Sequence, residues 1–214
     1  RRRTPTNGST SSILNDRSSI AEPLVKIQLV SDVHTEFHRD KGREWLASRP
    51  VEGVDVLVVA GDLTTGQYLA DVLRSLCASY PHVVYVTGNH EYYGSDRENI
   101  HRLLFRLQAE LPNLHWLEDR AVVIEGQRFV GCALWFEDDP DGLNAVYGKF
   151  LSDFRAIRGF QDWVYEVNER SRRFLEENIE PGDVVITHHQ PHPEVVAPIF
   201  RTGKLSVLNR FFLC

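Results

Sequence analysis

Four short apolar runs are separated by polar stretches along the chain, at residues 25–30, 54–60, 83–87 and 183–187. Each has the length and the β-branched content of a β-strand. The run at 54–60 (VDVLVVA) is almost continuously apolar, which is typical of a strand buried on both faces. We therefore predict four strands, the first of them entering the core.

Between these runs, apolar residues recur three and four positions apart, which predicts amphipathic helices. Residues 67–79 and 163–179 show this spacing, and a shorter helix is predicted over 44–47. A further helix is predicted to begin at Ser95, where Glu98 completes a capping box, and to end at Pro112. Residues 114–135 predict an antiparallel hairpin around a Glu125-Gly126 turn, and residues 137–148 a polar loop.

This order of elements predicts an α/β fold with a mixed sheet, or two stacked sheets, flanked by helices. Residues 1–24 are rich in Ser, Thr, Asn and Arg and lack apolar periodicity. Such a segment buries too little surface to offset the entropy lost on ordering, so we predict a disordered N-terminal extension. Residues 25–214 are interpreted as one domain.

Composition narrows the classes of partner. The chain is 42% hydrophobic and 25% charged, as is usual for a soluble globular protein. Its formal net charge of -6 argues against a nucleic-acid partner, and no apolar run is long enough to predict a membrane span. Three cysteines without CxxC spacing are interpreted as thiols in a reducing compartment. We therefore expect a cytoplasmic protein.

Polar residues with metal-binding side chains follow each of the four predicted strands. The sequence reads Ser-Asp-Val-His after the first strand, Gly-Asp after the second, Gly-Asn-His-Glu after the third and His-His after the fourth. In open α/β sheets, ligands bind beyond the carboxyl ends of the strands. We therefore expect these residues to share one crevice: Asp32, His34, Asp62, Asn89, His90 and His188.

The residue types suit a pair of divalent cations. Asp32 and His34 are two positions apart, so in an extended segment their side chains point the same way and can share one metal. The two oxygens of Asp62 can bridge two ions, and Asn89 and His188 can supply an oxygen and a nitrogen to the second ion. Mixed N/O ligation without thiolate suits Mn, Fe or Zn.

Each motif alone is weak. Asp-x-His and Gly-Asp arise often by chance, and a His-His pair near a chain end is more often a surface feature than a ligand pair. Their occurrence together, in order and each directly after an apolar strand, is the informative signal.

These ordered motifs resemble those of the calcineurin-like metallophosphoesterases, over residues 25 to about 193. The resemblance implies a four-layer αββα sandwich that hydrolyses a phosphodiester or phosphomonoester by attack of a metal-bound hydroxide. It implies that Asp32 and His34 bind one metal, that Asp62 bridges, and that Asn89 and His188 bind the other. It also implies that His90 protonates the leaving oxygen or stabilises the charge that develops there.

The sequence departs from the family pattern at its C-terminal end. The Gly-His-x-His segment that supplies further ligands in the family is absent, and His189 and His192 do not match its position. We therefore expect the domain to be incomplete at the C-terminus.

Alternatives to an active phosphoesterase are an inactive or truncated member that acts as a binding protein, and a nuclease of the same fold. The absence of a Lys/Arg cluster near the motifs argues against the nuclease. The expected substrate is a small phosphoester, and a nucleotide is one candidate. Three candidate specificity loops are residues 35–42, 92–96 and 137–148, and one ring of Tyr92 and Tyr93 is expected to pack in the core.

Overall fold

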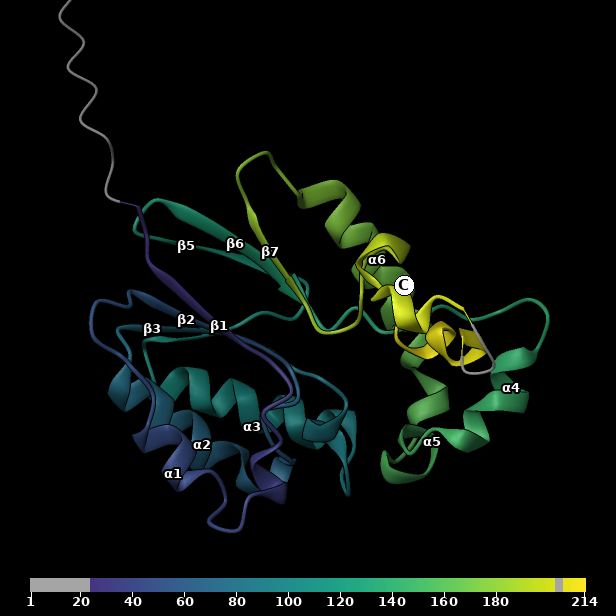
Figure 1. Cartoon of the computed structure of the whole chain (residues 1–214), viewed down its shortest axis with the longest axis horizontal. Coiled ribbons are helices and arrows are strands. Elements are labelled where there is room, and N and C mark those ends of the chain that lie inside the picture. The colour runs from purple at the N-terminus through teal and green to yellow at the C-terminus, as the bar shows by residue number, and fades with distance from the viewer. Residues whose placement is uncertain (1–23, 203–205) are drawn as a thin grey trace, which may run out of the picture.

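The computed structural model describes residues 24–202 and 206–214. Two β-sheets stack face to face, helices cover the outer face of the first sheet, and one helix packs on part of the outer face of the second (Figure 1). The four layers are those of the predicted αββα sandwich, which is confirmed. The predicted disorder of residues 1–24 lies, except for Leu24, outside the described residues.

The first sheet has the order β1-β2-β3-β4, and all its strands are parallel. The strands are Ile27–Val30 (β1), Val56–Ala60 (β2), His82–Val86 (β3) and Leu114–Trp116 (β4). The first three agree with the predicted strands, with ends that differ by one or two residues. The prediction that β1 enters the core was wrong, because β1 lies at the edge of the sheet and is partly exposed.

The second sheet has the order β5-β6-β7 and consists of Arg120–Ile124 (β5), Gln127–Cys132 (β6) and Val184–Thr187 (β7). β5 and β6 form the predicted antiparallel hairpin, with Glu125 and Gly126 at φ 49° and 85° in its turn. The predicted hairpin was wrong for residues 114–116, which pair in parallel with β3 instead. Alternating apolar residues indicate a strand but not its partner.

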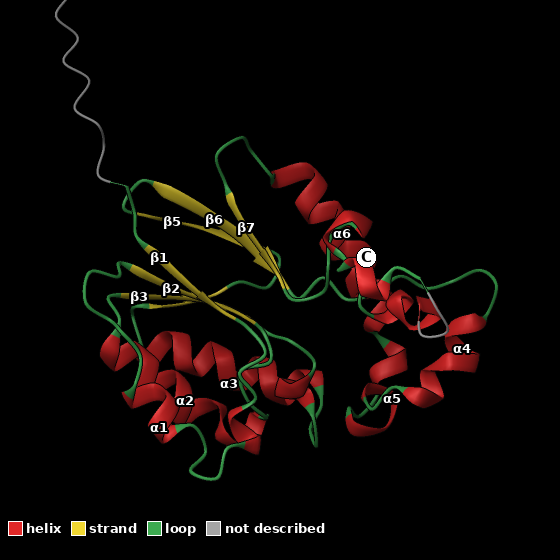
Figure 2. Cartoon of the chain, viewed as in Figure 1, coloured by secondary structure: helices red, strands yellow, loops and turns green. Residues whose placement is uncertain are grey.

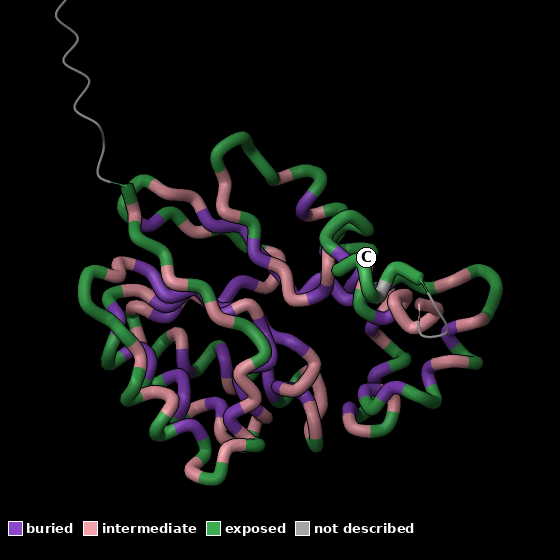
Figure 3. The backbone as a smooth tube through the Cα atoms, viewed as in Figure 1, coloured by how far each residue is buried: buried purple, intermediate pink, exposed green. Residues whose placement is uncertain are grey.

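Three helices cover the first sheet: Arg43–Ala47 (α1), Gly66–Ser79 (α2) and Arg97–Glu110 (α3) (Figure 1). Val164–Asn178 (α6) packs on part of the second sheet, where its Leu175 contacts Val130 and Cys132 of β6. The side chains of β2 alternate between the two faces of its sheet: Leu57 packs with the helices, and Val56 packs with the second sheet. The continuous apolar run of β2 therefore serves two cores, and Figure 3 shows the buried residues along these strands.

The N-cap of α3 is Asp96 and not the predicted Ser95. Asp96 has an extended backbone and its carboxylate accepts a hydrogen bond from the N–H of Asn99, at 2.8 Å. Ser95 instead accepts the N–H of Arg158 with its backbone carbonyl, at 2.9 Å. A long-range backbone contact therefore sets where the helix begins.

The remaining elements lie at the end of the sheets where the parallel strands finish (Figure 2). They include Leu143–Tyr147 (α4), Asp153–Ala156 (α5) and the 3-10 helix Ser206–Phe211 (η7). The prediction of a loop over 137–148 was wrong in part, because Asp139 accepts the N–H of Leu143 at 2.8 Å and starts α4 there. Among the described residues, no helix has both the length and the apolar character needed to cross a membrane.

Candidate metal centre

The loops after β1 and β2 run side by side. The N–H of Asp32 donates to the carbonyl of Gly61 at 3.2 Å, and that of His34 to the carbonyl of Asp62 at 3.0 Å. Asp32, His34 and Asp62 all lie in the left-handed region, with φ of 50°, 50° and 53°. Such a conformation costs about 1–3 kcal/mol per residue and is concentrated at functional sites. Three of the predicted ligands therefore lie on strained backbone that neighbouring loops hold in place.

Two glycines allow the loops to approach closely. A Cβ atom on Gly61 would collide with the ring of His188, and one on Gly88 would collide with Oδ1 of Asp62. The glycines in the Gly-Asp and Gly-Asn motifs are therefore required by packing around the site, in addition to any need for a tight turn.

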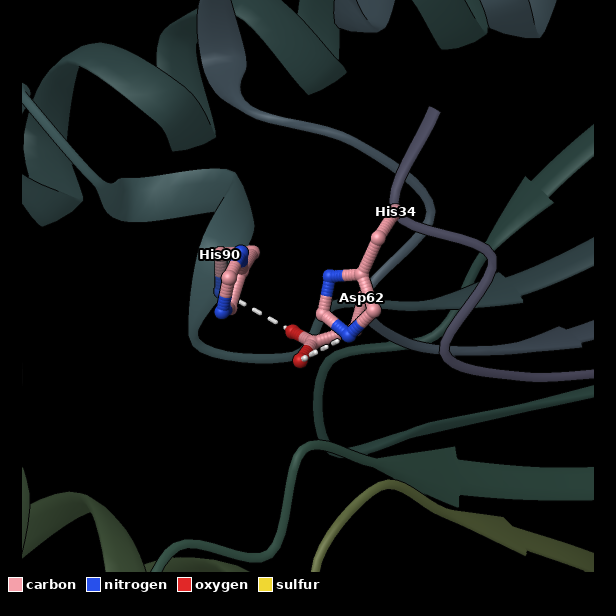
Figure 4. A group of neighbouring side chains, drawn as sticks. All are labelled: His34, Asp62 and His90. Carbon is pink, nitrogen blue, oxygen red and sulfur yellow. Dashed lines mark hydrogen bonds and ion pairs between the residues drawn. The ribbon is translucent and has the colours of Figure 1, made fainter. Parts of the chain in front are cut away.

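Asp62 is the meeting point of two groups of potential ligands. Its carboxylate lies with His34 and His90 in one group (Figure 4) and with Asp32 and His188 in the other. The ligand atoms of each group lie within 4.8 Å of one another. Nε2 of His34 is 3.6 Å from one Asp62 oxygen, and Nε2 of His188 is 3.6 Å from the other. This arrangement is the one that a bridging carboxylate requires.

The two groups divide the predicted ligands differently from the expectation that Asp32 and His34 share a metal. That expectation assumed an extended segment, in which residues two apart point the same way. Because both residues have positive φ, the alternation does not hold, and Asp32 lies with His188 instead. His90, predicted to act on the substrate, lies among the potential ligands with His34.

His188 presents a free nitrogen to the centre. Its Nδ1 lies 3.0 Å from the carbonyl oxygen of Ala60, which can only accept, so Nδ1 carries the hydrogen. Nε2 then has a lone pair that points at Asp62 and at Oδ1 of Asn89, 3.3 Å away. A backbone carbonyl that fixes the tautomer of a histidine is a common feature of metal-binding histidines.

The carboxamide of Asn89 is also oriented. Its Nδ2 donates to Asp153 at 2.8 Å and to the hydroxyl of Tyr93 at 2.9 Å, and this leaves Oδ1 facing His188. Tyr93 donates in turn to Asp153 at 2.6 Å. Burial raises the pKa of the Asp153 carboxyl, whereas the bonds from Tyr93 and Asn89 lower it. The oxygen of Asn89, which is the atom that can bind a metal, is therefore directed at the centre.

His90 is held by two carboxylates. Its backbone N–H donates to Asp62 at 2.9 Å, and its Nδ1 lies 2.7 Å from Oε1 of Glu36. The half-buried Glu36 follows His34 by two residues, and its Oε1 also lies 3.4 Å from Nδ1 of that histidine. Glu36 therefore connects the loop after β1 to the loop after β3.

Glu91 ties the loops to the sheet. Its carboxylate accepts the backbone N–H groups of Asp62, Leu63 and Gly88 at 3.3, 2.9 and 2.9 Å, and the hydroxyl of Tyr85 at 2.8 Å. Burial and the nearby charge of Asp62 raise the pKa of Glu91 to about 7. This residue supports the position of Asp62 and is itself fully buried.

The donor set fits divalent metal ions. Ligands held about 2.0–2.2 Å from one ion lie within roughly 4.4 Å of each other. The 3.6 Å separations around Asp62 are in that range and are longer than hydrogen bonds. Imidazole nitrogens and carboxylate and amide oxygens make up the set, with no thiolate, which suits Mn, Fe or Zn.

The other two C-terminal histidines lie outside both ligand groups. His189 is buried against Trp135, with its Nδ1 3.2 Å from the carbonyl oxygen of Ala133, and burial lowers its pKa to about 3. His192 is exposed and caps the 3-10 helix Pro193–Val195. Of the histidines after β7, His188 is therefore the one that the structure brings to Asp62.

A cavity of about 530 Å³ opens beside the candidate ligands. Tyr93 lines it, whereas Tyr92 is buried between Trp135 and Trp163, as expected for one ring of the pair. Of the candidate specificity loops, residues 35–42 and 137–148 contribute nothing to the lining. The lining comes instead from residues 150–153 and from the C-terminal segment around residues 208–212.

Three residues of this centre have no role in the sequence-based prediction: Glu36, Glu91 and Asp153. Glu91 belongs to the Gly-Asn-His-Glu motif, and its place in that motif is a signal that could have identified it. Glu36 is close in sequence to His34, but only the fold brings it to His90. Asp153 is 64 residues from Asn89, and no local pattern connects the two.

Known proteins resemble this chain over most of its length. A family model for the calcineurin-like phosphoesterases matches residues 25–208. An uncharacterized protein of Acanthamoeba polyphaga mimivirus is 20% identical over 191 residues, which are 77% of this chain and 68% of the viral protein.

Among solved structures, the phosphopantetheinyl hydrolase of Mycobacterium tuberculosis has a similar fold, with a TM-score of 0.66 at 18% identity. The match covers 88% of this chain and 75% of the hydrolase. At this identity the similarity shows a shared fold. Together with the family match over most of its length, it shows that this chain belongs to the calcineurin-like phosphoesterase family.

Proposed function

We propose that this chain hydrolyses a small phosphoester, either a phosphodiester or a phosphomonoester, with two divalent metal ions. The observation that carries the proposal is the position of Asp62, whose two oxygens face separate groups of potential ligands. Asp32, His34, Asp62, Asn89 and His188 would hold the ions, which we propose to be Mn, Fe or Zn.

Bound divalent cations would polarise the phosphoryl oxygens and lower the pKa of a bound water to about 7. The protein supplies the groups around them. His90 lines the cavity, and because its Nδ1 donates to Glu36, its Nε2 is left for proton exchange with the leaving oxygen. Asp62 also accepts the N–H of His90 and so fixes the distance between the metal ligands and that histidine.

The proposal is tested by hydrolysis of bis-p-nitrophenyl phosphate and p-nitrophenyl phosphate by the purified chain with added Mn. Metal-dependent turnover is expected. Asp62→Ala should abolish it by removing the shared ligand, and His90→Ala should lower kcat by about 10²–10⁴-fold. His192→Ala is the matched control, since His192 is exposed and outside both ligand groups, and it should leave the rate unchanged.

Three other results would contradict the proposal. A folded chain that binds Mn without turnover would be a binding protein of the same family. A chain that cleaves single-stranded DNA or RNA but neither p-nitrophenyl ester would be a nuclease. Turnover that persists in Asp62→Ala would show that the chemistry takes place elsewhere.

A further inference from the structure

The cavity beside the metal centre has two chemically different walls. One carries the candidate ligands, and the other is apolar. Phe150, Leu151, Leu208, Phe211 and Phe212 form this second wall, which we call the apolar wall. Leu151 and Phe211 are buried and form its base, whereas Phe150 and Phe212 are 64% and 53% exposed at its rim.

The apolar wall is anchored to the fold. The ring of Phe211 packs at 5.1 Å from that of Phe136 and at 6.0 Å from that of Phe154, between ring centroids. The backbone N–H of Gln190 donates to the carbonyl of Phe212 at 2.8 Å. Because Gln190 follows His188 by two residues, this bond sets the distance between the wall and a candidate metal ligand.

The ring of Phe150 lies 6.5 Å from that of Tyr147, between centroids, and both Phe150 and Phe212 stay exposed at the cavity. Two aromatic side chains beside a polar centre form an apolar patch of the type that marks ligand sites. Nζ of Lys149 lies 5.1 Å from the centre of the Phe150 ring, but Phe150 lines the cavity and Lys149 does not.

The charges of the cavity also restrict the ligand. No lysine or arginine occurs among the described residues that line it, and three carboxylates do, those of Asp32, Asp62 and Asp153. The negative charge of the reacting phosphoryl group would be balanced by the metal ions. A second phosphate or a carboxylate on the substrate would meet the carboxylates and aromatic rings of the lining, and Lys149, which lies over Phe150, is outside that lining.

We propose that the substrate is a monoanionic phosphodiester that carries a planar or otherwise apolar, uncharged ester group, which lies against Phe150 and Phe212. This inference rests on the proposed function, because it places the phosphorus atom at the candidate metal centre. It excludes nucleoside di- and triphosphates and other polyanionic esters.

The test uses diesters with the same leaving group. Phenyl p-nitrophenyl phosphate and methyl p-nitrophenyl phosphate both release p-nitrophenolate. They differ mainly in the second ester group, which is the group proposed to contact the apolar wall. We expect kcat/KM to favour the phenyl ester by about tenfold. Phe150→Ala and Phe212→Ala should remove most of this preference by raising KM for the phenyl ester, with little change for the methyl ester. Adding a carboxylate to the phenyl ring should abolish the preference.

Phe105→Ala is the matched control. Phe105 is 50% exposed, similar to Phe212, but does not line this cavity, so its removal should leave both esters unaffected. A preference that survives in both Phe150→Ala and Phe212→Ala, or faster turnover of the carboxylated ester than of the phenyl ester, would overturn the inference.

A binding measurement can fail or succeed independently of hydrolysis, so it tests this inference separately from the proposed function. Calorimetric titration of the Mn-loaded chain with diphenyl phosphate and dimethyl phosphate needs no turnover. Tighter binding of diphenyl phosphate, lost in the two phenylalanine variants, is expected even if no ester is hydrolysed, and in that event only the proposed hydrolysis fails. Equal binding of the two phosphates would refute the apolar subsite whatever the hydrolysis assay shows.

Discussion

At the scale of single residues, the centre depends on side chains that orient its ligands. Asn89 can present either end of its carboxamide, and only its oxygen binds a metal. Asp153 and the hydroxyl oxygen of Tyr93 both accept hydrogen bonds from the amide nitrogen, which directs the oxygen of Asn89 toward His188. The contribution of Asn89 to metal binding is therefore set by a residue from a different part of the chain.

Asp153→Ala is expected to weaken Mn binding by about 10–100-fold, the usual cost of losing a group that orients a metal ligand. Calorimetric titration with Mn measures the effect directly. Asp141→Ala removes an exposed acid from the same segment and should leave the affinity unchanged. Equal affinities for Asp153→Ala and the parent chain would show that the amide of Asn89 needs no such support.

At the scale of elements, long-range contacts decide where α3 begins. Asp96 accepts the N–H of Asn99 and also pairs with Arg158 at 2.8 Å. The bond to Asn99 and the charge of Arg158 both lower the pKa of the Asp96 carboxyl, as expected for a capping carboxylate. The helix follows directly from the loop that carries His90, so its start helps to position the centre.

Asp96→Ala should destabilise the protein by about 1 kcal/mol, because the first turn of α3 loses its capping group. Ser95→Ala should change the free energy of unfolding much less, since Ser95 contributes through its backbone carbonyl. Urea unfolding followed by circular dichroism compares the two variants. A larger loss of stability in Ser95→Ala than in Asp96→Ala would show instead that Ser95 caps the helix, as the sequence predicts.

At the scale of the whole molecule, a buried carboxylate connects three layers of the fold. Oε1 of Glu118, next to β5, lies 3.4 Å from Arg97 of α3 and 3.6 Å from Arg170 of α6. Its Oε2 is buried without a hydrogen-bond partner among the described residues. Burial, followed by the charge of Asp119, raises the pKa of Glu118 to about 7 from 4.5, and the two arginines offset only part of this rise.

Because the pKa of Glu118 is higher in the folded protein than in the unfolded chain, folding favours the protonated form of its carboxyl group. The contribution of Glu118 to stability is therefore most favourable below pH 4.5 and declines as the pH rises toward 7. Glu118→Gln, which resembles the protonated form, should gain stability relative to the parent chain between pH 5 and pH 8, by about 1–3 kcal/mol.

Urea unfolding at the two pH values measures this difference. Glu110→Gln is the control, because Glu110 pairs with Arg74 at the surface and its pKa is lowered, so its relative stability should not rise with pH. A constant difference between Glu118→Gln and the parent chain at both pH values would show that Glu118 is ionised throughout.

The sequence by itself determined the features that depend on neighbouring residues. Apolar periodicity located the principal strands and helices, because the burial of one face leaves a local repeat. The motifs after β1, β2, β3 and β7 indicated where the candidate centre lies, because the strand ends place them there and Gly61 and Gly88 permit their close approach. The family followed from the order of these motifs.

The tertiary structure alone decided what depends on contacts between distant residues. It paired β4 with β3, moved the helix cap from Ser95 to Asp96, and placed Asp32 with His188. It also brought Asp153 to Asn89 and the apolar wall to the cavity. These features have no local repeat in the sequence, because partners far apart along the chain meet only when both sheets and the helices that cover them are packed.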